Sequence, residues 1–390
     1  MGSLLNRKRK YTWSDITLKL ILLFPITTLL QRFMAFNHLN KILICVLAIL
    51  LLFSNRKLSY KSVFLVIFLT FLFVMTLFYT EFDIQYINEY FYLPIWVLYY
   101  IYFKNNFAHI LHLLYKNIAF IRTVIMLWML VATGYLLVIL THQPLSNDSI
   151  YTDHRAAATC LFVLILIWIY IALTGRKRIL LFGAIPILYT LMMSARTYLV
   201  VNTIVLTCIY YYCCNKKRWF YLTLIPWALI FIYIVTLTPM MTKIQSSLQK
   251  NLVYDFWGML TSGRTVFFKI DMDAYFNLSF WNQMVGNGIT YVHQVNKDLY
   301  GVDLWAHNDF INILLSNGLG GLILYLIVFI DFCKTSFMEC GSIFYLFFFL
   351  MACFMNAMLN GLYLYTCAML AMPFMMTAGI FSIKNGCVFR

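Results

Sequence analysis

The sequence predicts an all-α integral membrane protein with about twelve transmembrane helices and one large outer loop. Of its 390 residues, 63% are hydrophobic, 18% are aromatic and only 11% are charged. A soluble globular domain carries about 25% charged residues. Apolar runs of roughly 17 to 20 residues recur along almost the whole chain, and helices of this length cross a bilayer. The first run lacks a small-residue cleavage site, so we expect no cleaved signal peptide.

The predicted spans follow these apolar runs in order. They cover approximately residues 15–36, 41–54, 63–80, 88–103, 122–141, 157–174, 179–195, 197–214, 219–238, 310–332, 343–359 and 362–382. The second run is short and the seventh almost meets the eighth, so ten or eleven spans remain open alternatives. The chain then divides into an N-terminal transmembrane region (1–238, about nine spans), a large outer loop (239–309) and a C-terminal transmembrane region (310–390, about three spans).

Basic residues recur at alternate junctions between spans and thereby set the orientation. They cluster at Arg7 to Lys10, Arg56 to Lys61, Lys104 to Arg122, Arg176 to Arg178 and Lys216 to Arg218. If the helices alternate, all of these clusters lie on one side, which the positive-inside rule identifies as the cytoplasm. Most acidic residues fall on the opposite side. We therefore expect both termini in the cytoplasm and residues 239–309 on the outer side.

Charge and cysteine use exclude several other classes of protein. The net charge of +15 is concentrated in the loops, and no basic patch interleaved with aromatic residues indicates a nucleic-acid partner. The ten cysteines map to spans or cytoplasmic segments, and none forms a CxxC pair. The sequence therefore predicts neither a disulfide framework nor a metal site. We expect no cofactor, and we expect membrane lipids around the apolar surface.

The loop of residues 239–309 is the one long connection in a chain of short ones. A structureless segment of that length is uncommon and usually functional. Two amphipathic stretches, MMTKIQSSLQKNLVYDFWGML and RTVFFKIDMDAYF, predict short helices that lie at the membrane interface. Gly286, Asn287 and Gly288 predict a turn.

A polar motif stands at the start of the tenth predicted span. It reads AHNDFINILLSNGLGG, in which His307 and Asn308 precede Gly318, Gly320 and Gly321. An ionisable residue at the edge of a bilayer is a functional-site hypothesis by default, because burial of such a group is costly. His307 can be neutral near pH 7 and can then accept a proton from an alcohol. Asp303 and Asp309 are the next candidates for this role.

Permanently charged groups converge on the same outer side. They are the guanidinium groups of Arg155, Arg196 and Arg264, which lie near the predicted outer ends of spans or in the large loop. His307 lies on the same side. A guanidinium forks onto phosphate oxygens, so arginines at this depth suit a lipid-linked diphosphate. We expect a metal-independent glycosyl transfer. His154 and His293 give weaker signals on the same side.

Simpler interpretations remain for each residue taken alone. Arg196 could extend only to the outer headgroups, and Arg264 could be a solvated loop residue or a helix cap. Arg155 could pair only with a neighbouring aspartate, and His307 could contact headgroups. The glycines could serve close helix packing alone.

The motif resembles the signature of the O-antigen polymerase and O-antigen ligase superfamily. The pattern is His307-Asn308, nine residues, then Gly318-x-x-Gly321, and it resembles that family's first element. Arg264 in its SGR setting and Arg196 at the end of a mid-chain span resemble the other two elements. The resemblance covers mainly residues 190–330, and the overall plan of about twelve spans with one large loop is also similar.

This resemblance implies a substrate and roles for the site residues. The family uses undecaprenyl-diphosphate-linked oligosaccharides on the outer face of the bacterial inner membrane. Arg196 and Arg264 would bind the diphosphate, and His307 would activate the acceptor. Asn308 would orient the imidazole or the acceptor sugar. Arg155 matches no motif, and we add it to the diphosphate site on its position alone.

The family contains polymerases and ligases, and the motif does not separate them. The aromatic-rich composition favours a polymerase that extends lipid-linked repeat units, with a ligase that transfers finished glycan to lipid A–core as the alternative. A chain-length regulator and a flippase of the same pathway would be partners. A lipid-linked sugar flippase is a lower-ranked alternative, because mid-span charge is nearly absent. A non-catalytic scaffold or sensor would not need the arginine and histidine cluster.

Overall fold

The computed structural model describes residues 13–31, 38–55, 59–79, 83–141, 154–214, 217–238, 241, 264–300, 303 and 305–385. These residues form helices and the turns between them, without a strand.

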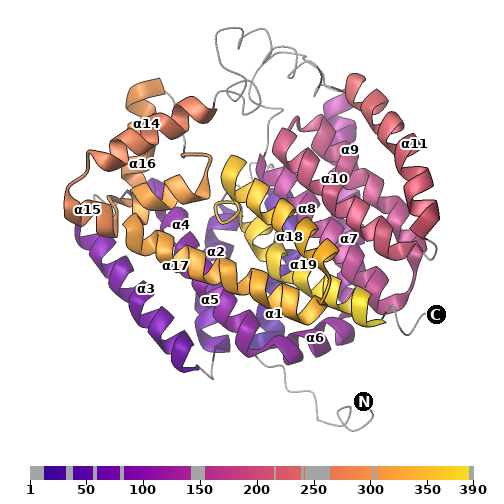
Figure 1. The fold of residues 1–390 in the computed structure, drawn as a ribbon, viewed down its shortest axis with the longest axis horizontal. Helices are drawn as coiled ribbons and strands as arrows, with labels where there is room; N and C mark the ends of the chain where they lie inside the picture. The colour runs from indigo at the N-terminus through magenta and orange to yellow at the C-terminus, as the bar shows by residue number, and fades with distance from the viewer. Residues whose placement is uncertain are drawn as a thin grey trace.

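Figure 1 shows the helices in chain order. They are α1 (Trp13–Leu30), α2 (Leu39–Ser54), α3 (Tyr60–Tyr79), η3 (Ile84–Tyr86), α4 (Ile87–Tyr90), α5 (Tyr92–Asn105), α6 (Phe107–Lys116), α7 (Ile118–Thr141), α8 (His154–Thr174), η5 (Lys177–Gly183), α9 (Ala184–Met192), α10 (Arg196–Cys213), α11 (Lys217–Thr236), α14 (Arg264–Phe276), α15 (Phe280–Val285), α16 (Gly288–Tyr300), α17 (Asp309–Cys340), α18 (Ile343–Leu359) and α19 (Thr366–Asn385).

The length and composition of these helices confirm the predicted class. Among the described residues, seven helices are long and apolar enough to cross a membrane: α1, α3, α7, α8, α11, α17 and α19. The shorter helices α2 and α18 are also apolar. Large apolar side chains are exposed along α3 and α11, which a soluble protein would rarely tolerate over such an area. The chain is therefore an all-α membrane protein.

Two predicted spans are broken in the structure. The run at 88–103 is divided between α4 and the 14-residue α5. The run at 179–195 begins as the 3₁₀ helix η5 and continues as the nine-residue α9. Pro186 lies in the first turn of α9, where its missing N–H leaves no intrahelical hydrogen bond unmade. The short helix α6, which the sequence analysis did not anticipate, links α5 to α7.

Helix α8 forms the centre of the packing, and nearly every side chain from Ala156 to Ala172 is buried. It contacts α19 most extensively, and α1, α7, α9 and α10 surround it. Polar groups on α8 are paired internally: Trp128 Nε1 donates to Thr159 Oγ1 at 2.9 Å, and that hydroxyl donates to the carbonyl of Ala156. Such pairing is required where no water can reach the groups.

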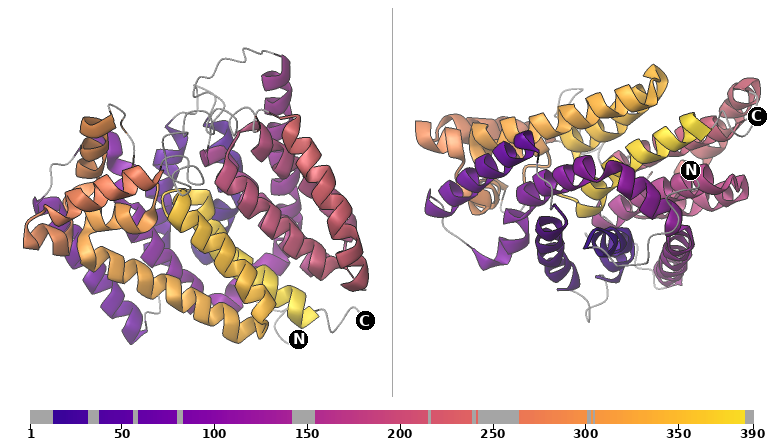
Figure 2. Two further views of the ribbon diagram at one scale, coloured as in Figure 1. Left: turned by 45° about the horizontal axis from the view of Figure 1, so that its top comes forward. Right: turned by 90° about the horizontal axis from the view of Figure 1, so that it is seen from below.

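The described part of the large loop, residues 264–300, folds as α14, α15 and α16. Helix α14 coincides with the predicted stretch RTVFFKIDMDAYF. The other amphipathic stretch, at 240–260, lies outside the described residues apart from Met241. Gly286 and Gly288 have φ angles of 86° and 79°, which confirms the predicted turn. Figures 1 and 2 show α14 to α16 grouped with α3 at one side of the bundle and α9 to α11 at the other.

A second, smaller hydrophobic core attaches helices α14 to α16 to the rest of the helical bundle. Its buried members are Tyr90, Tyr275, Ile289, Val292, Ala306, Ile311 and Leu315. They come from α4, α14, α16, the segment that precedes α17 and the start of α17. Packing of these side chains fixes the large-loop helices against the N-terminal end of α17.

The glycines of the motif allow α15 and α17 to approach closely. Gly318 has φ 64° and ψ −169°, which interrupts α17. A Cβ at Gly318 would lie 2.4 Å from the backbone carbon of Met284, and one at Gly286 would lie 2.3 Å from the carbonyl oxygen of Ser316. Close packing, which the sequence analysis kept as an alternative for these glycines, is therefore their structural role.

We predict that Gly318→Ala destabilises the protein by at least about 1 to 3 kcal/mol, because alanine would meet both a left-handed φ and a backbone contact. Gly134→Ala is the matched control: a Cβ there meets nothing within 4 Å, so helix propensity should leave stability unchanged or raise it. Thermal unfolding in detergent micelles measures both variants. Equal stability of the two variants would contradict the assigned packing role.

Candidate functional site

His307 lies in the segment that leads into α17. Its φ of 52° is rare for a residue with a Cβ and costs of the order of 1–3 kcal/mol. Such strain persists only where the surroundings enforce it. The next residue, Asn308, caps α17: its side-chain oxygen accepts from Phe310 N at 2.9 Å and Ile311 N at 3.3 Å. The amide nitrogen of Asn308, which donates to Met358 Sδ at 4.0 Å, is the part of the side chain that remains for the acceptor-orienting role predicted from the sequence.

The imidazole of His307 is enclosed by aromatic rings. The ring centroid of Trp305 lies 5.7 Å away and that of His154 lies 6.4 Å away. Within the described part of the chain, Nδ1 of His307 is buried and has no hydrogen-bond partner. Burial, assisted by the positive charge of Arg264, lowers the pKa of His307 to about 3. The imidazole is thus neutral at physiological pH.

Arg264 is the first residue of α14 and points toward two other segments. Its guanidinium donates to Thr197 Oγ1 at 3.5 Å and to Asn360 Oδ1 at 3.4 Å, both of which are long contacts. None of the described carboxylates forms an ion pair with it. Burial lowers the pKa of Arg264, and the charge of Arg196 acts in the same direction. An anion would therefore be stabilised beside Arg264.

Arg196 and Arg155 each begin a helix. Arg196 is the first residue of α10 and directly precedes Thr197, the hydroxyl that Arg264 contacts. Arg155 is the second residue of α8, and its guanidinium lies 5.8 Å from the ring centroid of Trp305. The structure thus brings Arg155 to the same tryptophan that contacts His307, and it brings Arg196 beside Arg264.

Four further residues connect these arginines to His307: His154, Trp305, Asn360 and Tyr365. The sequence analysis missed three of them and ranked His154 low. Asn360, which follows the last residue of α18, accepts a hydrogen bond from Arg264 through its side-chain oxygen. The amide nitrogen of Asn360 lies 3.4 Å from Nδ1 of His154. The ring of Tyr365 lies 5.7 Å from Trp305 and 6.3 Å from His154. His154 was the only one of the four with a sequence signal, since it immediately precedes Arg155. We call the set His154, Arg155, Arg196, Arg264, Trp305, His307, Asn360 and Tyr365 the arginine–histidine cluster.

Asp309 and Asp303, the alternative bases, are engaged elsewhere. Asp309 is fully buried, and its carboxylate accepts from Leu362 N at 2.7 Å, Tyr363 N at 3.1 Å and Tyr325 Oη at 3.0 Å. Asp303 accepts from Tyr86 Oη at 2.6 Å and bonds to His293. Among the described residues, no group of three or more His, Cys, Asp or Glu side chains could hold a metal ion.

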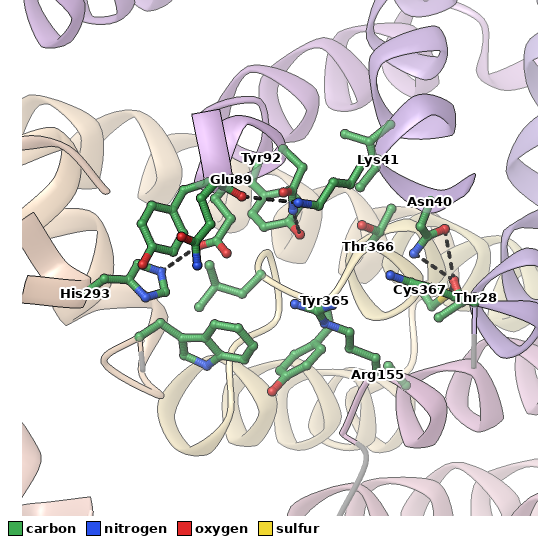
Figure 3. A pocket seen from close by; sticks show the side chains of 18 of the residues that line it. Thr28, Asn40, Lys41, Glu89, Tyr92, Arg155, His293, Tyr365, Thr366 and Cys367 are labelled. Atoms are coloured by element: carbon green, nitrogen blue, oxygen red, sulfur yellow. Dashed lines mark hydrogen bonds and ion pairs between the residues drawn. The ribbon is translucent and has the colours of Figure 1, made fainter. Parts of the chain in front are cut away.

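A polar cavity of about 350 Å³ adjoins the arginine–histidine cluster (Figure 3). Arg155, Trp305 and Tyr365 line the cavity and also belong to the cluster, whereas His307, Arg196 and Arg264 do not line it. The remaining walls come from the ends of α1 and α2, from η3 and α4, and from α16 and the start of α19. A cavity of this size lies within the range of small-ligand sites.

Comparisons with known proteins found no family model and no curated protein that matches the chain.

Proposed function

We propose that this chain is a membrane glycosyltransferase that polymerises undecaprenyl-diphosphate-linked oligosaccharide repeat units into an O-antigen or capsule-type polysaccharide. The observation that carries the proposal is the meeting of His307, Arg264 and Arg196 in one enclosed site, with Arg155 one aromatic ring away. Arg264, with which none of the described carboxylates forms an ion pair, suits a diphosphate, and a neutral histidine suits an alcohol. The sequence motif that resembles the polymerase and ligase superfamily contains three of these four residues.

The topology that belongs to this function has twelve crossings. They are α1, α2, α3, α5, α7, α8, η5 with α9, α10, α11, α17, α18 and α19. Alternate crossing places the N-terminal ends of α8, α10 and α17 on one face, and α14 follows the end of α11 on that same face. The basic clusters then lie on the opposite face, which is the cytoplasmic side of the inner membrane.

Reporter fusions test this orientation. Fusions after Lys61, Arg178 and Arg218 should report a cytoplasmic position, and fusions within residues 264–300 should report an outer position. A cytoplasmic report from residues 264–300 would place the site in the wrong compartment and end the proposal.

The proposed reaction moves one glycan from a carrier lipid to an acceptor hydroxyl. His307 takes the hydroxyl proton while the oxygen forms a bond to the anomeric carbon of the donor. The bond from that carbon to the phosphate oxygen breaks, and the diphosphate leaves on its lipid. Arg264 and Arg196 stabilise the charge of the leaving diphosphate, so the protein itself supplies the positive charge that the reaction needs.

Donor binding also makes His307 a stronger base. In the empty site the charge of Arg264 helps to lower the pKa of His307. A bound diphosphate offsets that charge and raises the pKa toward neutrality, where a general base is most effective. Proton abstraction is thereby favoured only when the donor is in place.

Transfer of finished glycan to lipid A–core is the second candidate function, because it uses the same donor and leaving group. In a host with lipid A–core, a deletion strain separates the two on a glycan gel. We expect core with a single repeat unit, the product of a missing polymerase. Bare core with polymer left on the carrier would identify a ligase. Repeat units trapped on the cytoplasmic side would identify a flippase.

We predict that Arg264→Ala abolishes polymer formation, because loss of a phosphate contact in an enclosed site costs about 2 to 5 kcal/mol. Arg264→Lys should recover little activity, since an ammonium is a point charge without the guanidinium fork. The measurement is polymerisation of lipid-linked repeat units by reconstituted protein. Arg122→Ala, which removes an exposed arginine of α7, is the control and should keep the parent rate. Parent-level rates in Arg264→Lys would show that only a positive charge is needed.

We predict that His307→Ala lowers the transfer rate by about 10²- to 10⁴-fold and leaves donor binding nearly unchanged. The base works only when unprotonated, so activity is lost as pH falls through its pKa. The free protein should therefore keep kcat/KM until the pH approaches about 3, as far as His307 is concerned. The acid limb of kcat should lie at higher pH, because the bound diphosphate raises that pKa.

Exposed His112 provides the control, and His112→Ala should leave both the rate and the pH profile unchanged. A near-parent rate for His307→Ala would show that the base lies elsewhere. Coincident acid limbs of kcat and kcat/KM would show that the donor does not act on the histidine.

A further inference from the structure

The cavity beside the arginine–histidine cluster has a lining unlike that of the cluster itself. Hydroxyls and carboxamides dominate it, including Asn88 and, as labelled in Figure 3, Thr28, Asn40, Tyr92 and Thr366. Several of these groups hold one another in place: Asn40 Nδ2 donates to Thr28 Oγ1 at 3.3 Å, and Asn88 Nδ2 donates to Tyr92 Oη at 2.9 Å. The lining thus presents fixed donors and acceptors rather than flexible chains.

Ionised groups are paired on the side of the cavity wall that carries His293, whereas Arg155 adds a guanidinium on the side of Trp305. His293 bonds to both Glu89 and Asp303, and Tyr86 donates to Asp303 while its ring stacks on the imidazole at 4.0 Å. Burial alone would lower the pKa of His293, but the hydrogen bonds and charges of the two carboxylates outweigh it and raise that pKa. Lys41 donates to the carbonyl of Gln85 at 3.2 Å. The positive charge that His293 can carry is therefore offset by two carboxylates, so this part of the wall does not favour a second diphosphate.

The same network makes the cavity wall rigid. It links α4, through Glu89, to α16, through His293, and Tyr90 Oη lies 3.0 Å from Thr290 Oγ1 across the same two helices. A wall held at several points loses little conformational entropy when a ligand binds. Fixed hydroxyl and amide partners together with tyrosine and tryptophan faces match the chemistry of a saccharide, which offers many hydroxyls and apolar ring faces.

We propose that this cavity binds the saccharide of the acceptor substrate, an inference that rests on the proposed glycosyl transfer. The donor sugar must stay beside its diphosphate at Arg264 and Arg196, and neither residue lines the cavity. Trp305 does line it, and the ring of Trp305 lies 5.7 Å from His307. An oligosaccharide can thus place its terminal hydroxyl at His307 while its following sugars occupy the cavity.

A binding experiment tests the assignment with two probes. One is the repeat-unit oligosaccharide, released from the carrier lipid of the producing strain by mild acid and radiolabelled. The other is inorganic diphosphate. Lys41→Ala and Tyr92→Phe change the cavity lining, and Tyr92→Phe removes one oxygen without changing packing. Lys116→Ala on α6 and Tyr210→Phe on α10 are matched controls outside the cavity.

We expect each cavity variant to bind the oligosaccharide about tenfold more weakly, the effect of losing one or two hydrogen bonds to a ligand. Both variants should bind inorganic diphosphate as the parent does, whereas Arg264→Ala should lose diphosphate binding. Maltotetraose, a saccharide of unrelated structure, should bind the parent more weakly than the repeat unit. Parent-level oligosaccharide binding in both cavity variants would overturn the inference.

Kinetics distinguish the acceptor saccharide from that of the donor. With one lipid-linked substrate labelled at a time, the cavity variants should raise the acceptor concentration needed for half-maximal rate and leave that of the donor unchanged. A rise for the donor alone would overturn the assignment. The binding result is separable from the proposed function. Weaker oligosaccharide binding in the variants supports a saccharide cavity even if the parent protein transfers no glycan. Parent-level binding in both variants refutes the cavity assignment even if the parent protein transfers glycan.

Discussion

Asp309 ties the segment that carries His307 to the segment that carries Asn360. Hydrogen bonds to a buried carboxyl group offset part of its lost hydration. Oδ2 of Asp309 accepts from the Tyr325 hydroxyl and from two successive backbone amides, at Leu362 and Tyr363, whereas Oδ1 has no partner among the described residues. The turn between α18 and α19 is thereby held against the start of α17. Gly361, with φ 106°, allows the chain to make that turn beside the carboxylate. The geometry of the arginine–histidine cluster depends on this junction.

The electrostatics of the cluster follow from its enclosure. Arg196 lowers the pKa of Arg264, and Arg264 lowers that of His307. A diphosphate would relieve both effects at once. Linkage requires the converse: if the donor raises the pKa of His307, protonation of His307 must strengthen donor binding by the same factor. In the proposed reaction, the affinity for the diphosphate donor and the pKa of His307 therefore change together.

The sequence predicted what depends on local pattern and left out what depends on contacts between distant segments. The helical membrane class and the helix at 264–276 follow from composition and periodicity. The break of the predicted span at 179–195 could not be predicted in this way. A run of apolar residues has the same composition whether it forms one helix or a 3₁₀ turn and a short helix. The arginines and His307 could be proposed from their residue types. Trp305 and Asn360 could not, because their importance lies in contacts with segments far away in the chain.

The spacing of the motif acquires a physical meaning from these contacts. Nine residues separate Asn308, which caps α17, from Gly318, where α17 is interrupted and meets the backbone of α15. The backbone amide of Asn287, in the turn after α15, donates to the carbonyl of Leu315 at 2.8 Å at the same crossing. Helices α14, α15 and α16 all contact α17, so the glycine crossing sets their position along it. Arg264 begins α14 and His307 immediately precedes the Asn308 cap of α17. The glycines therefore act on the site through distance: they fix how far the guanidinium lies from the imidazole without contacting either.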